Sequence, residues 1–367
     1  MAQKVTIDGS FGEGGGQILR TSLALSALTG RELEISNVRA GRAKPGLRPQ
    51  HLQGVRAAAE ICSAQVAGAT LGSQKIDFRP GAVRGGGYRF EIGTAGSTSL
   101  VLQTVYLPLA LTAGETSTIA ICGGTHVPMA PCFHYLDMQW RHFMERIGLR
   151  VSLAMKSAGY YPRGGGEITA EIHPSSYQQA QLQHSALQQA APYLSGKLLP
   201  VVIDDRGKLL AIRGVSSVTG LPMSIAERQK HQALIRLAGV GCPVAIEMVD
   251  VPGVGQGTML LLLAVFENSQ ACYCALGARG KRAEAVADEA ADALLELIRG
   301  RGAVDEHLAD QLILPLSLAG GASSFVTPKV TTHLLTNIEV IKHFLPVEFD
   351  VKGEVGREGR VVVRPGL

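Results

Sequence analysis

A pattern of helical and strand segments recurs three times along the chain, and it restricts the fold more than any other feature. Helical apolar spacing occurs at Gln17–Leu28 and Arg48–Cys62, and strand patterns occur at Leu33–Val38, Lys75–Arg79 and Tyr88–Ile92. The order helix, strand, helix, strand, strand then recurs over residues 98–172 and again over 309–363. We therefore predict an α/β (α+β) protein built from three repeated units, whose sheets pack against helices.

A smaller pattern of strand, helix, strand and strand interrupts the third unit. Its segments are Leu209–Val218, Ile225–Ala238, Val244–Val249 and Met259–Phe266. Before it lies Gln178–Ala191, a stretch rich in Gln and Ala that is typical of a linker or an exposed helix. We predict two repeats in residues 1–180, a linker and an inserted small α/β domain in 181–280, and the third repeat in 281–367. Arg282–Arg299 is predicted to be a long helix that leads from the insert back to the third repeat.

The composition is that of an ordinary globular protein, and it limits how a nucleic acid could bind. Of the 367 residues, 46% are hydrophobic and 5% are aromatic, so a surface of many stacked rings is not expected. The formal net charge of +4 is too small to attract nucleic acid by itself, so any anion site must rest on local clusters of basic residues.

The sequence has no feature of a secreted or membrane protein. The N-terminus has no signal-peptide pattern, no apolar run reaches membrane-spanning length, and the six cysteines include no CxxC pair. We expect a cytoplasmic protein with reduced, packed thiols.

A glycine-rich segment precedes the first predicted helix and carries two charged side chains. It reads GSFGEGGGQILR from Gly9 to Arg20. Glycines let backbone N–H groups approach an anion, and the start of the following helix favours negative charge. Glu13 could hold a divalent cation and Arg20 could pair with phosphate. Tight turns between repeats would explain the glycines equally well, and the segment is not a Walker A loop.

A basic loop between a strand and a helix is a second candidate anion site. It runs from Arg39 to His51 and includes Arg42, Lys44 and Arg48. Guanidinium groups bind phosphate through paired hydrogen bonds, and ligand sites of α/β proteins tend to lie where a strand leads into a helix. The alternative is a solvated basic loop with no ligand.

His333 lies at the predicted start of the second helix of the third unit. Thr331 or Thr332 can cap this helix, which places His333 in the first turn, beside and not within the apolar stripe. The positive end of the helix dipole disfavours imidazolium and favours a nearby phosphate. A neutral imidazole is the form that attacks phosphorus. The alternative is a polar first-turn residue with no role.

Two further polar features stand near helix patterns of the second and third units. The run His307-Leu-Ala-Asp-Gln311 opens the third unit, where Asp and Gln also serve as ordinary helix caps. Gln103 lies inside the apolar run Leu100–Leu111. A buried amide needs hydrogen-bond partners, which a ligand base or a neighbouring backbone group could supply.

Together these segments resemble the RNA 3′-terminal phosphate cyclase family. The words GEGGGQILR, RAGRAKPGL, GSQKIDFRPG, RGGGYRFEIGTAGS, LVLQT, YYPRGGGE, HLADQLILPLSLAG and HLLTNIEVIKHFLP occur in the family's order along nearly the whole chain. The resemblance implies the family fold of three such repeats with a smaller insert. It also implies that AMP passes from ATP to a histidine and then to an RNA 3′-phosphate. In the last step AMP is released and the RNA end becomes a 2′,3′-cyclic phosphate.

The resemblance also implies roles for particular residues. His333 matches the nucleophile, and Glu13 matches an acidic residue near a divalent metal, Mg²⁺ or Mn²⁺, and the triphosphate. The expected ATP contacts are Gln103, Pro131 as a wall against adenine, His307, Leu308, Ala309, Asp310 and Gln311. The expected contacts to the RNA phosphate are Arg20, Arg39, Arg42 and His51. We expect His333 to face the basic loop across a cleft, with the nucleotide between repeats.

Two departures and three alternatives accompany this interpretation. His307 stands where relatives often have Tyr, and His126 stands where a smaller or acidic residue is expected. The alternatives are a ribosome-biogenesis relative that lacks the catalytic histidine, an enolpyruvyl transferase, and a module that only binds RNA ends. The expected partners are ATP and RNA with a 3′-terminal phosphate, no membrane, and a homodimer as one open form of assembly.

Overall fold

The computed structural model describes residues 4–175 and 198–366, and within them three units share one topology. Each unit runs strand, helix, strand, helix, strand, strand. The first unit comprises β1 (Val5–Asp8), α1 (Gly16–Thr29), β2 (Leu33–Ser36), α2 (Pro49–Cys62), β3 (Gln65–Ala67) and β4 (Ile76–Arg79). The second comprises β5 (Gly87–Glu91), α3 (Thr98–Thr112), β6 (Ser117–Gly123), α4 (Phe133–Tyr135), the π-helix η1 (Leu136–Trp140), α5 (Arg141–Arg146), β7 (Val151–Ser157) and β8 (Gly166–Ile172).

The third unit is split by the insert. It comprises β9 (Val202–Ile203), α9 (Glu306–Leu316), β14 (Ser323–Thr327), α10 (Thr332–Lys342), β15 (Val347–Lys352) and β16 (Gly359–Pro365). The insert comprises β10 (Leu209–Thr219), α7 (Met223–Leu237), β11 (Val244–Asp250), β12 (Gly257–Phe266), β13 (Gln270–Leu276) and α8 (Ala283–Arg299). The predicted fold class is therefore confirmed. The linker predicted at residues 178–191 lies outside the described residues.

The strand order is the same in the three repeated units. The sheets run β1-β2-β4-β3, β5-β6-β8-β7 and β9-β14-β16-β15, with the first pair of strands parallel in each. The prediction that Tyr88–Ile92 closes the first unit is wrong, because β5 pairs with β6 and so opens the second unit. The sequence of a strand does not show which strand it pairs with. The pattern of segments therefore did not show at which strand each repeated unit begins.

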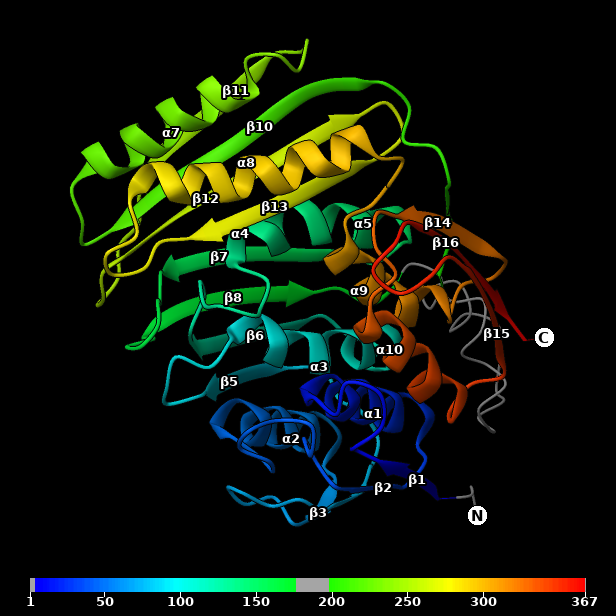
Figure 1. Ribbon diagram of the computed structural model, residues 1–367. Helices are drawn as coiled ribbons and strands as arrows, with labels where there is room; N and C mark the ends of the chain where they lie inside the picture. Colours follow the sequence, from blue (N-terminus) through cyan, green and yellow to red (C-terminus); the bar gives the residue numbers. More distant parts are fainter. Residues whose placement is uncertain (1–3, 176–197, 367) are drawn as a thin grey trace.

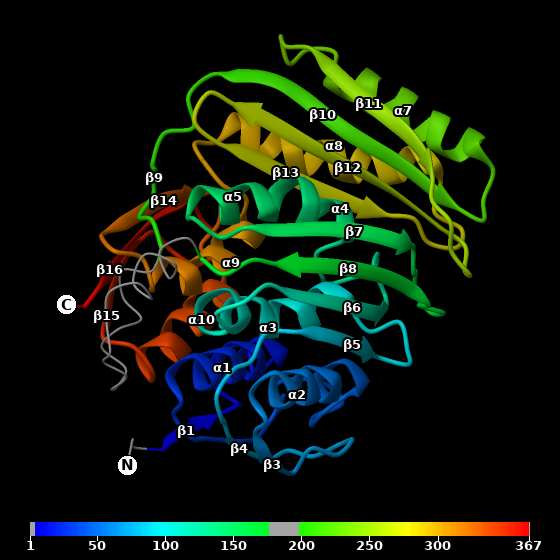
Figure 2. The ribbon, with the colours of Figure 1, turned by 180° about the vertical axis from the view of Figure 1, so that it is seen from behind.

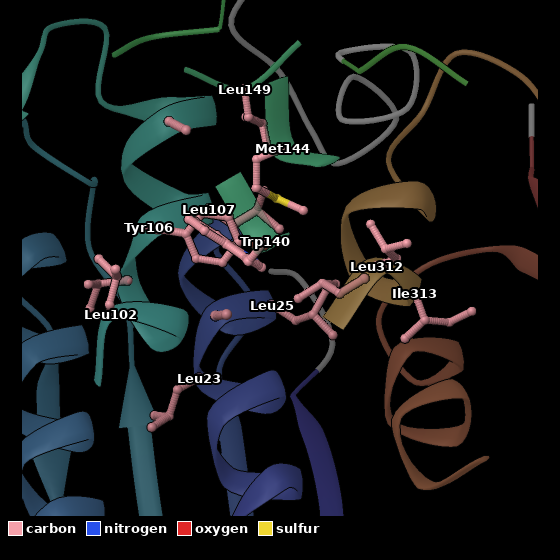
Figure 3. Close-up of a cluster of buried hydrophobic side chains, with 14 of the residues drawn as sticks. Leu23, Leu25, Leu102, Tyr106, Leu107, Trp140, Met144, Leu149, Leu312 and Ile313 are labelled. Carbon is pink, nitrogen blue, oxygen red and sulfur yellow. The ribbon is translucent and has the colours of Figure 1, made fainter. Parts of the chain in front are cut away.

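The helices of the three units meet in a common apolar core. Figure 1 shows α1, α3, α9 and α10 side by side between the sheets, and Figure 2 shows the same helices from behind. Figure 3 shows clustered side chains from α1, α3, α9 and the α4–α5 segment, including Leu25, Tyr106, Trp140 and Leu312. The rings of Tyr106 and Trp140 meet edge to face, with centroids 4.9 Å apart. This core fixes the relative positions of the helix ends that carry the candidate site.

The sequence pattern over Pro131–Ile147 predicts a single helix, but the observed helix begins later and contains a π-turn. Its helical residues start at Phe133 and pass through the π-helix η1 before α5. π-turns place one extra residue in a helix and shift the direction of the side chains that follow. Gln139, on the π-turn, is fully buried and donates hydrogen bonds to the backbone of Gln270 and to Asp305.

The insert covers the second unit with a sheet that is apolar on both faces. Along β12, Met259, Leu261 and Leu263 lie in the core shared with the repeats, whereas Leu260 and Leu262 lie in a separate core beneath α7 and α8. This alternation explains the continuous apolar run of the sequence, since a strand buried on both faces needs no polar positions. Because Val286, Ala290 and Leu294 of α8 lie in the second core, we propose that the insert extends to Arg299 and not to residue 280.

Candidate functional site

The glycine-rich loop and the basic loop lie against each other at the start of α1. Gly41 donates a backbone hydrogen bond of 3.2 Å to the carbonyl of Gly14. A side chain on Gly15 would bring its Cβ to 2.7 Å from Nη2 of Arg42, and one on Gly16 would bring it to 2.5 Å from Nε2 of His51. Glycine is therefore required for the two basic side chains to approach the helix N-terminus.

His333 lies at the start of α10, as predicted, and contacts the glycine-rich loop. Thr331 caps the helix, since its Oγ1 accepts a hydrogen bond of 3.1 Å from the N–H of Leu334. Nε2 of His333 lies 2.5 Å from Oε2 of Glu13, and Nδ1 lies 3.9 Å from Oδ2 of Asp310. The other carboxylate oxygen of Glu13 pairs with Arg42. Glu13 thus joins the basic loop of the first unit to the histidine of the third.

The imidazole of His333 is neutral at pH 7. Burial lowers its pKa to about 4, and the charges of Arg20, Arg42 and His307 act in the same direction. The contact with Glu13 would favour a charged imidazole, but Oε2 of Glu13 forms no hydrogen bond among the described residues, and burial prevails. Nδ1 has no hydrogen-bond partner within residues 4–175 and 198–366.

Three of the four residues expected to bind the RNA phosphate lie around the fourth, His51. Burial and, to a lesser extent, the charges of Arg39, Arg20, Arg42 and Arg48 together lower the pKa of His51 to about 3. Arg20 is itself buried, which lowers its pKa to about 10. Its Nε has no hydrogen-bond partner in the described part of the chain, and one Nη binds Gln17. This concentration of positive charge around buried, unpaired donors suits an anion.

Arg39 differs from the other arginines because its guanidinium holds the basic loop together. One Nη donates hydrogen bonds of 2.8 Å to the carbonyls of both Lys44 and Gly46. Its backbone has a φ of 57°, which is rare outside glycine. Arg39 therefore lies near His51, but one of its guanidinium nitrogens is already used in hydrogen bonds that shape the loop.

Apart from Pro131, the residues expected to contact ATP lie on α3 and in the first turn and a half of α9. Nε2 of Gln103 donates a hydrogen bond of 2.8 Å to Oε1 of Gln311, so these two amides partner each other. With Arg20, Asp310 and Asn337 they line a cavity of about 30 Å³, the size of one water molecule. Leu308 and Ala309 are fully buried in the apolar core, so the run exposes polar groups only at His307, Asp310 and Gln311.

Pro131 lies next to Ser99, which is one helical turn before Gln103 on α3. Its carbonyl accepts a hydrogen bond of 2.8 Å from Oγ of Ser99, four residues before Gln103. Cys132 follows Pro131 and caps the short helix α4. The structure therefore places Pro131 beside the start of α3, on the side of the second unit that also carries Gln103.

Asn337, which was not among the predicted site residues, connects the three helices of the site. Its Oδ1 accepts a hydrogen bond of 2.5 Å from Oγ1 of Thr21, and its Nδ2 donates one of 2.9 Å to the carbonyl of Asp310. It lies one turn after His333, at a buried position of α10. A polar residue at the spacing of an apolar stripe was the available sequence signal for it.

His126, which departs from the family pattern, lies in a buried polar cluster. It hydrogen-bonds Oγ1 of Thr125 at 2.8 Å and Nδ1 of His134 at 2.9 Å, and its ring stacks on Tyr160 at 5.0 Å. No ionic or hydrogen-bond contact of His126 with Glu13 or His333 occurs in the described residues. The departure therefore affects packing beside the insert.

A metal held by protein side chains alone is not evident in the described residues. No group of three or more His, Cys, Asp and Glu side chains there could hold a metal ion. Glu13 offers one carboxylate, which suits a cation that also binds phosphate oxygens of a nucleotide, as Mg²⁺ usually does.

None of the helices in the described part of the chain has the length and apolar character needed to cross a membrane.

Comparisons with known proteins show the family of the chain. The family model of RNA 3′-terminal phosphate cyclase matches residues 11–351. Proteins of that name from Pseudomonas fluorescens and Ralstonia nicotianae are 44% and 43% identical to the chain, over 95% and 98% of it and 94% and 96% of their own lengths. One from Pyrobaculum neutrophilum is 41% identical over 95% of both chains. The chain belongs to the RNA 3′-terminal phosphate cyclase family.

Proposed function

We propose that this chain is an ATP-dependent RNA 3′-terminal phosphate cyclase that works through a covalent adduct between His333 and AMP. One observation carries the proposal most directly. A neutral imidazole at a helix N-terminus lies between two carboxylates and next to the positively charged Arg20 and Arg42. Family membership supplies the substrate class, because relatives at 43–44% identity bear the name of this reaction.

In the first step, Nε2 of His333 attacks the α-phosphorus of ATP and the bond to pyrophosphate breaks. The nucleophile is Nε2 in this proposal because it faces Glu13 and Arg42, where the anion site lies. The ring becomes positively charged as the N–P bond forms. Asp310, whose Oδ2 lies 3.9 Å from Nδ1, can accept the Nδ1 proton in a hydrogen bond after a small movement.

Positive charge on the protein offsets the charge of the reacting phosphates. Arg20, Arg42 and the α1 N-terminus act on them directly, and pre-oriented donors in a site with little water are effective. A divalent cation, Mg²⁺ or Mn²⁺, would be held by Glu13 together with phosphate oxygens and would offset further negative charge. Glu13 fits this role because its Oε2 is buried without a hydrogen-bond partner among the described residues.

In the second step, an oxygen of the RNA 3′-phosphate attacks the phosphorus of the adduct. The N–P bond breaks, His333 is regenerated, and RNA(3′)pp(5′)A forms. The adjacent ribose O2′ then attacks the 3′-phosphorus, AMP leaves, and a 2′,3′-cyclic phosphate remains. Activation supplies the leaving group that a phosphomonoester lacks, and the neighbouring hydroxyl supplies proximity. The same hydroxyl explains a preference for RNA ends over DNA ends.

A non-catalytic relative that only binds RNA ends is the alternative. It would bind the RNA phosphate among the same basic side chains around His51, but it would need no neutral nucleophile. In the cyclase proposal the reaction takes place in the cytoplasm, where ATP and RNA ends are available. The homodimer stays a prediction.

The adduct tests the proposal directly. Incubation with α-labelled ATP and Mg²⁺ or Mn²⁺ should yield an acid-labile protein–AMP adduct, and His333→Ala should abolish it without loss of the fold, because the side chain is 37% exposed. The control is His343→Ala, which removes an exposed histidine just after the same helix and should leave the adduct intact. No adduct with the unaltered chain, or normal adduct with His333→Ala, would overturn the mechanism.

A further inference from the structure

The outer strand of the insert, β13, contacts both walls expected for the nucleotide base. It is the last strand of the sheet order β11-β10-β12-β13, and Figure 1 shows it next to α4. On one side, Sγ of Cys274 lies 3.4 Å from Sγ of Cys132, the residue after Pro131. On the other, the ring of Tyr273 meets the ring of His307. The insert therefore contacts His307 and the residue that follows Pro131, which are the two places where we expect the base of ATP to bind.

The contacts of Tyr273 concentrate on the first turn of α9. Its ring meets that of His307 nearly edge to face, with centroids 6.4 Å apart and an interplanar angle of 70°. Its hydroxyl donates a hydrogen bond of 2.6 Å to Oε2 of Glu306, the residue before His307. Both the aromatic ring and the hydroxyl of Tyr273 thus contact side chains of two consecutive residues, Glu306 and His307.

Tyr273 is immobilised, whereas His307 is open to a ligand. Tyr273 is only 8% exposed and lies in the apolar core of the insert. His307 is exposed. Tyr273 therefore restrains one side of an imidazole that is otherwise open, and a restrained ring loses less conformational entropy when a planar base stacks on it.

The N-terminus of α9 is fixed to β13 through its cap as well. Asp305 caps the helix, and its Oδ2 accepts a backbone hydrogen bond of 3.4 Å from Cys272, on the free edge of β13. The same oxygen accepts one of 2.7 Å from Nε2 of Gln139 of the second unit. The first turn of α9 is thus held between the insert and the second unit.

We propose that Tyr273 is a positioning residue for the nucleotide, because it holds the ring of His307 in the orientation that stacks on the base. Through Tyr273, the insert would shape the space that receives the base of ATP. This inference rests on the proposed function, which assigns His307 to ATP. It gives the insert a part in selecting the nucleotide, through a residue that belongs to no motif of the sequence.

Two substitutions separate the two contacts of Tyr273. Tyr273→Phe removes the hydrogen bond to Glu306 and keeps the ring, and Tyr273→Leu removes both while filling the apolar space. Tyr273→Leu should raise the KM for ATP in adduct formation by about 3- to 10-fold, the size expected for a lost aromatic contact, and should alter the maximal rate by less than about twofold. Tyr273→Phe, which should fold in any case, should have a smaller effect of the same kind.

A matched control and a double-mutant cycle show whether Tyr273 acts through His307. Tyr88→Leu removes another tyrosine whose hydroxyl donates to a backbone carbonyl, that of Arg84, and should leave the KM unchanged. In a His307→Ala background, Tyr273→Leu should raise the KM no further, because the contact has already been lost. A normal KM for Tyr273→Leu, or an equal rise with and without His307, would overturn the inference.

Direct binding of ATP distinguishes failure of this inference from failure of the proposed function. Calorimetric titration measures the Kd of ATP for the same variants without requiring the adduct. If the unaltered chain forms no adduct but the Kd rises in Tyr273→Leu only when His307 is present, the covalent mechanism fails and the positioning role stands. If the adduct forms and neither KM nor Kd responds to Tyr273→Leu, the positioning role fails and the mechanism stands.

Discussion

At the scale of single residues, burial controls the chemistry of His333 more than its place in the helix does. The helix terminus favours a neutral imidazole, but the larger causes of the pKa of about 4 are burial and the neighbouring Arg20 and Arg42. These arginines come from the first unit, so the sequence around His333 could not reveal them. The predicted neutral state is right in direction, and its main cause is tertiary.

Asp310 should give the adduct-forming step a pH dependence near neutrality. Burial raises its pKa to about 7, against the opposing charges of His307 and Arg20. The rate of adduct formation should therefore rise as pH rises through about 7, when the ionised carboxylate can accept the Nδ1 proton of His333. His333 adds no inflection above pH 5, since it is protonated only near and below pH 4. Single-turnover rates with labelled ATP from pH 5 to 9 measure this.

The control for the pH dependence is Asp310→Asn, which keeps the shape of the side chain but cannot ionise. We expect a rate lower by about 100-fold and flat through pH 7. An inflection near pH 7 that persists in Asp310→Asn would assign it to another group. The raised pKa also means that ionisation of Asp310 opposes folding, so its contribution to stability is complete below its ordinary pKa of 3.8 and is lost as pH rises through about 7.

At the scale of elements, helices were predicted closely and strand partners were not. The helix expected at Gln17–Leu28 is α1, Gly16–Thr29, and the one expected at Thr332–Phe344 is α10, Thr332–Lys342. Helical spacing and caps lie within a few residues of each other, so a single sequence displays them. The partner of β5 and the π-turn before α5 depend on segments far along the chain.

Two glycines at the ends of α1 should respond differently to the same substitution. Gly16→Ala would place a Cβ 2.5 Å from Nε2 of His51 and displace it, which should lower turnover of RNA 3′-phosphate by about 10- to 100-fold with little change in stability. Gly30→Ala meets no atom within 4 Å but occupies a left-handed C-cap with a φ of 67°, so it should cost about 1 kcal/mol of stability and leave turnover unchanged.

Thermal unfolding and turnover with an RNA 3′-phosphate, measured for both variants, check this pair. Gly16 begins the helix with an ordinary backbone conformation, so alanine there is tolerated by the backbone and the effect isolates the contact with His51. Normal turnover in Gly16→Ala would show that His51 does not need its present position. A loss of turnover in Gly30→Ala would show that the whole helix must be fixed for activity.

At the scale of the whole molecule, one buried carboxylate connects the second unit, the insert and the third unit. Asp305 is fully buried and accepts four hydrogen bonds. Its donors are Oη of Tyr135 at 2.6 Å, Nε2 of Gln139 at 2.7 Å, and the backbone N–H groups of Leu308 at 2.9 Å and Cys272 at 3.4 Å. If the carboxylate were removed, Tyr135, Leu308 and Cys272 would lose this acceptor, whereas Gln139 would keep its bond to the carbonyl of Gln270.

Asp305→Ala should lower the free energy of unfolding by at least about 3 kcal/mol, because several buried donors lose their partner together. Asp288→Ala is the matched control, since it removes a partly exposed carboxylate that lies 3.4 Å from Arg236, and it should cost no more than about 1 kcal/mol. Urea unfolding followed by circular dichroism measures both. Equal effects of the two substitutions would mean that Asp305 does not couple the three parts.

The sequence by itself determined the three repeats, most helix starts, and the position of His333 in a first turn, because those features are written in spacings of a few residues. Only the tertiary structure decided that Glu13 lies between Arg42 and His333, that Leu308 and Ala309 face the core, and that β13 of the insert supports α9. Glu13 and Thr336, which hydrogen-bond at 3.3 Å, are 323 positions apart. Such contacts depend on how whole helices pack, and no local pattern encodes that packing.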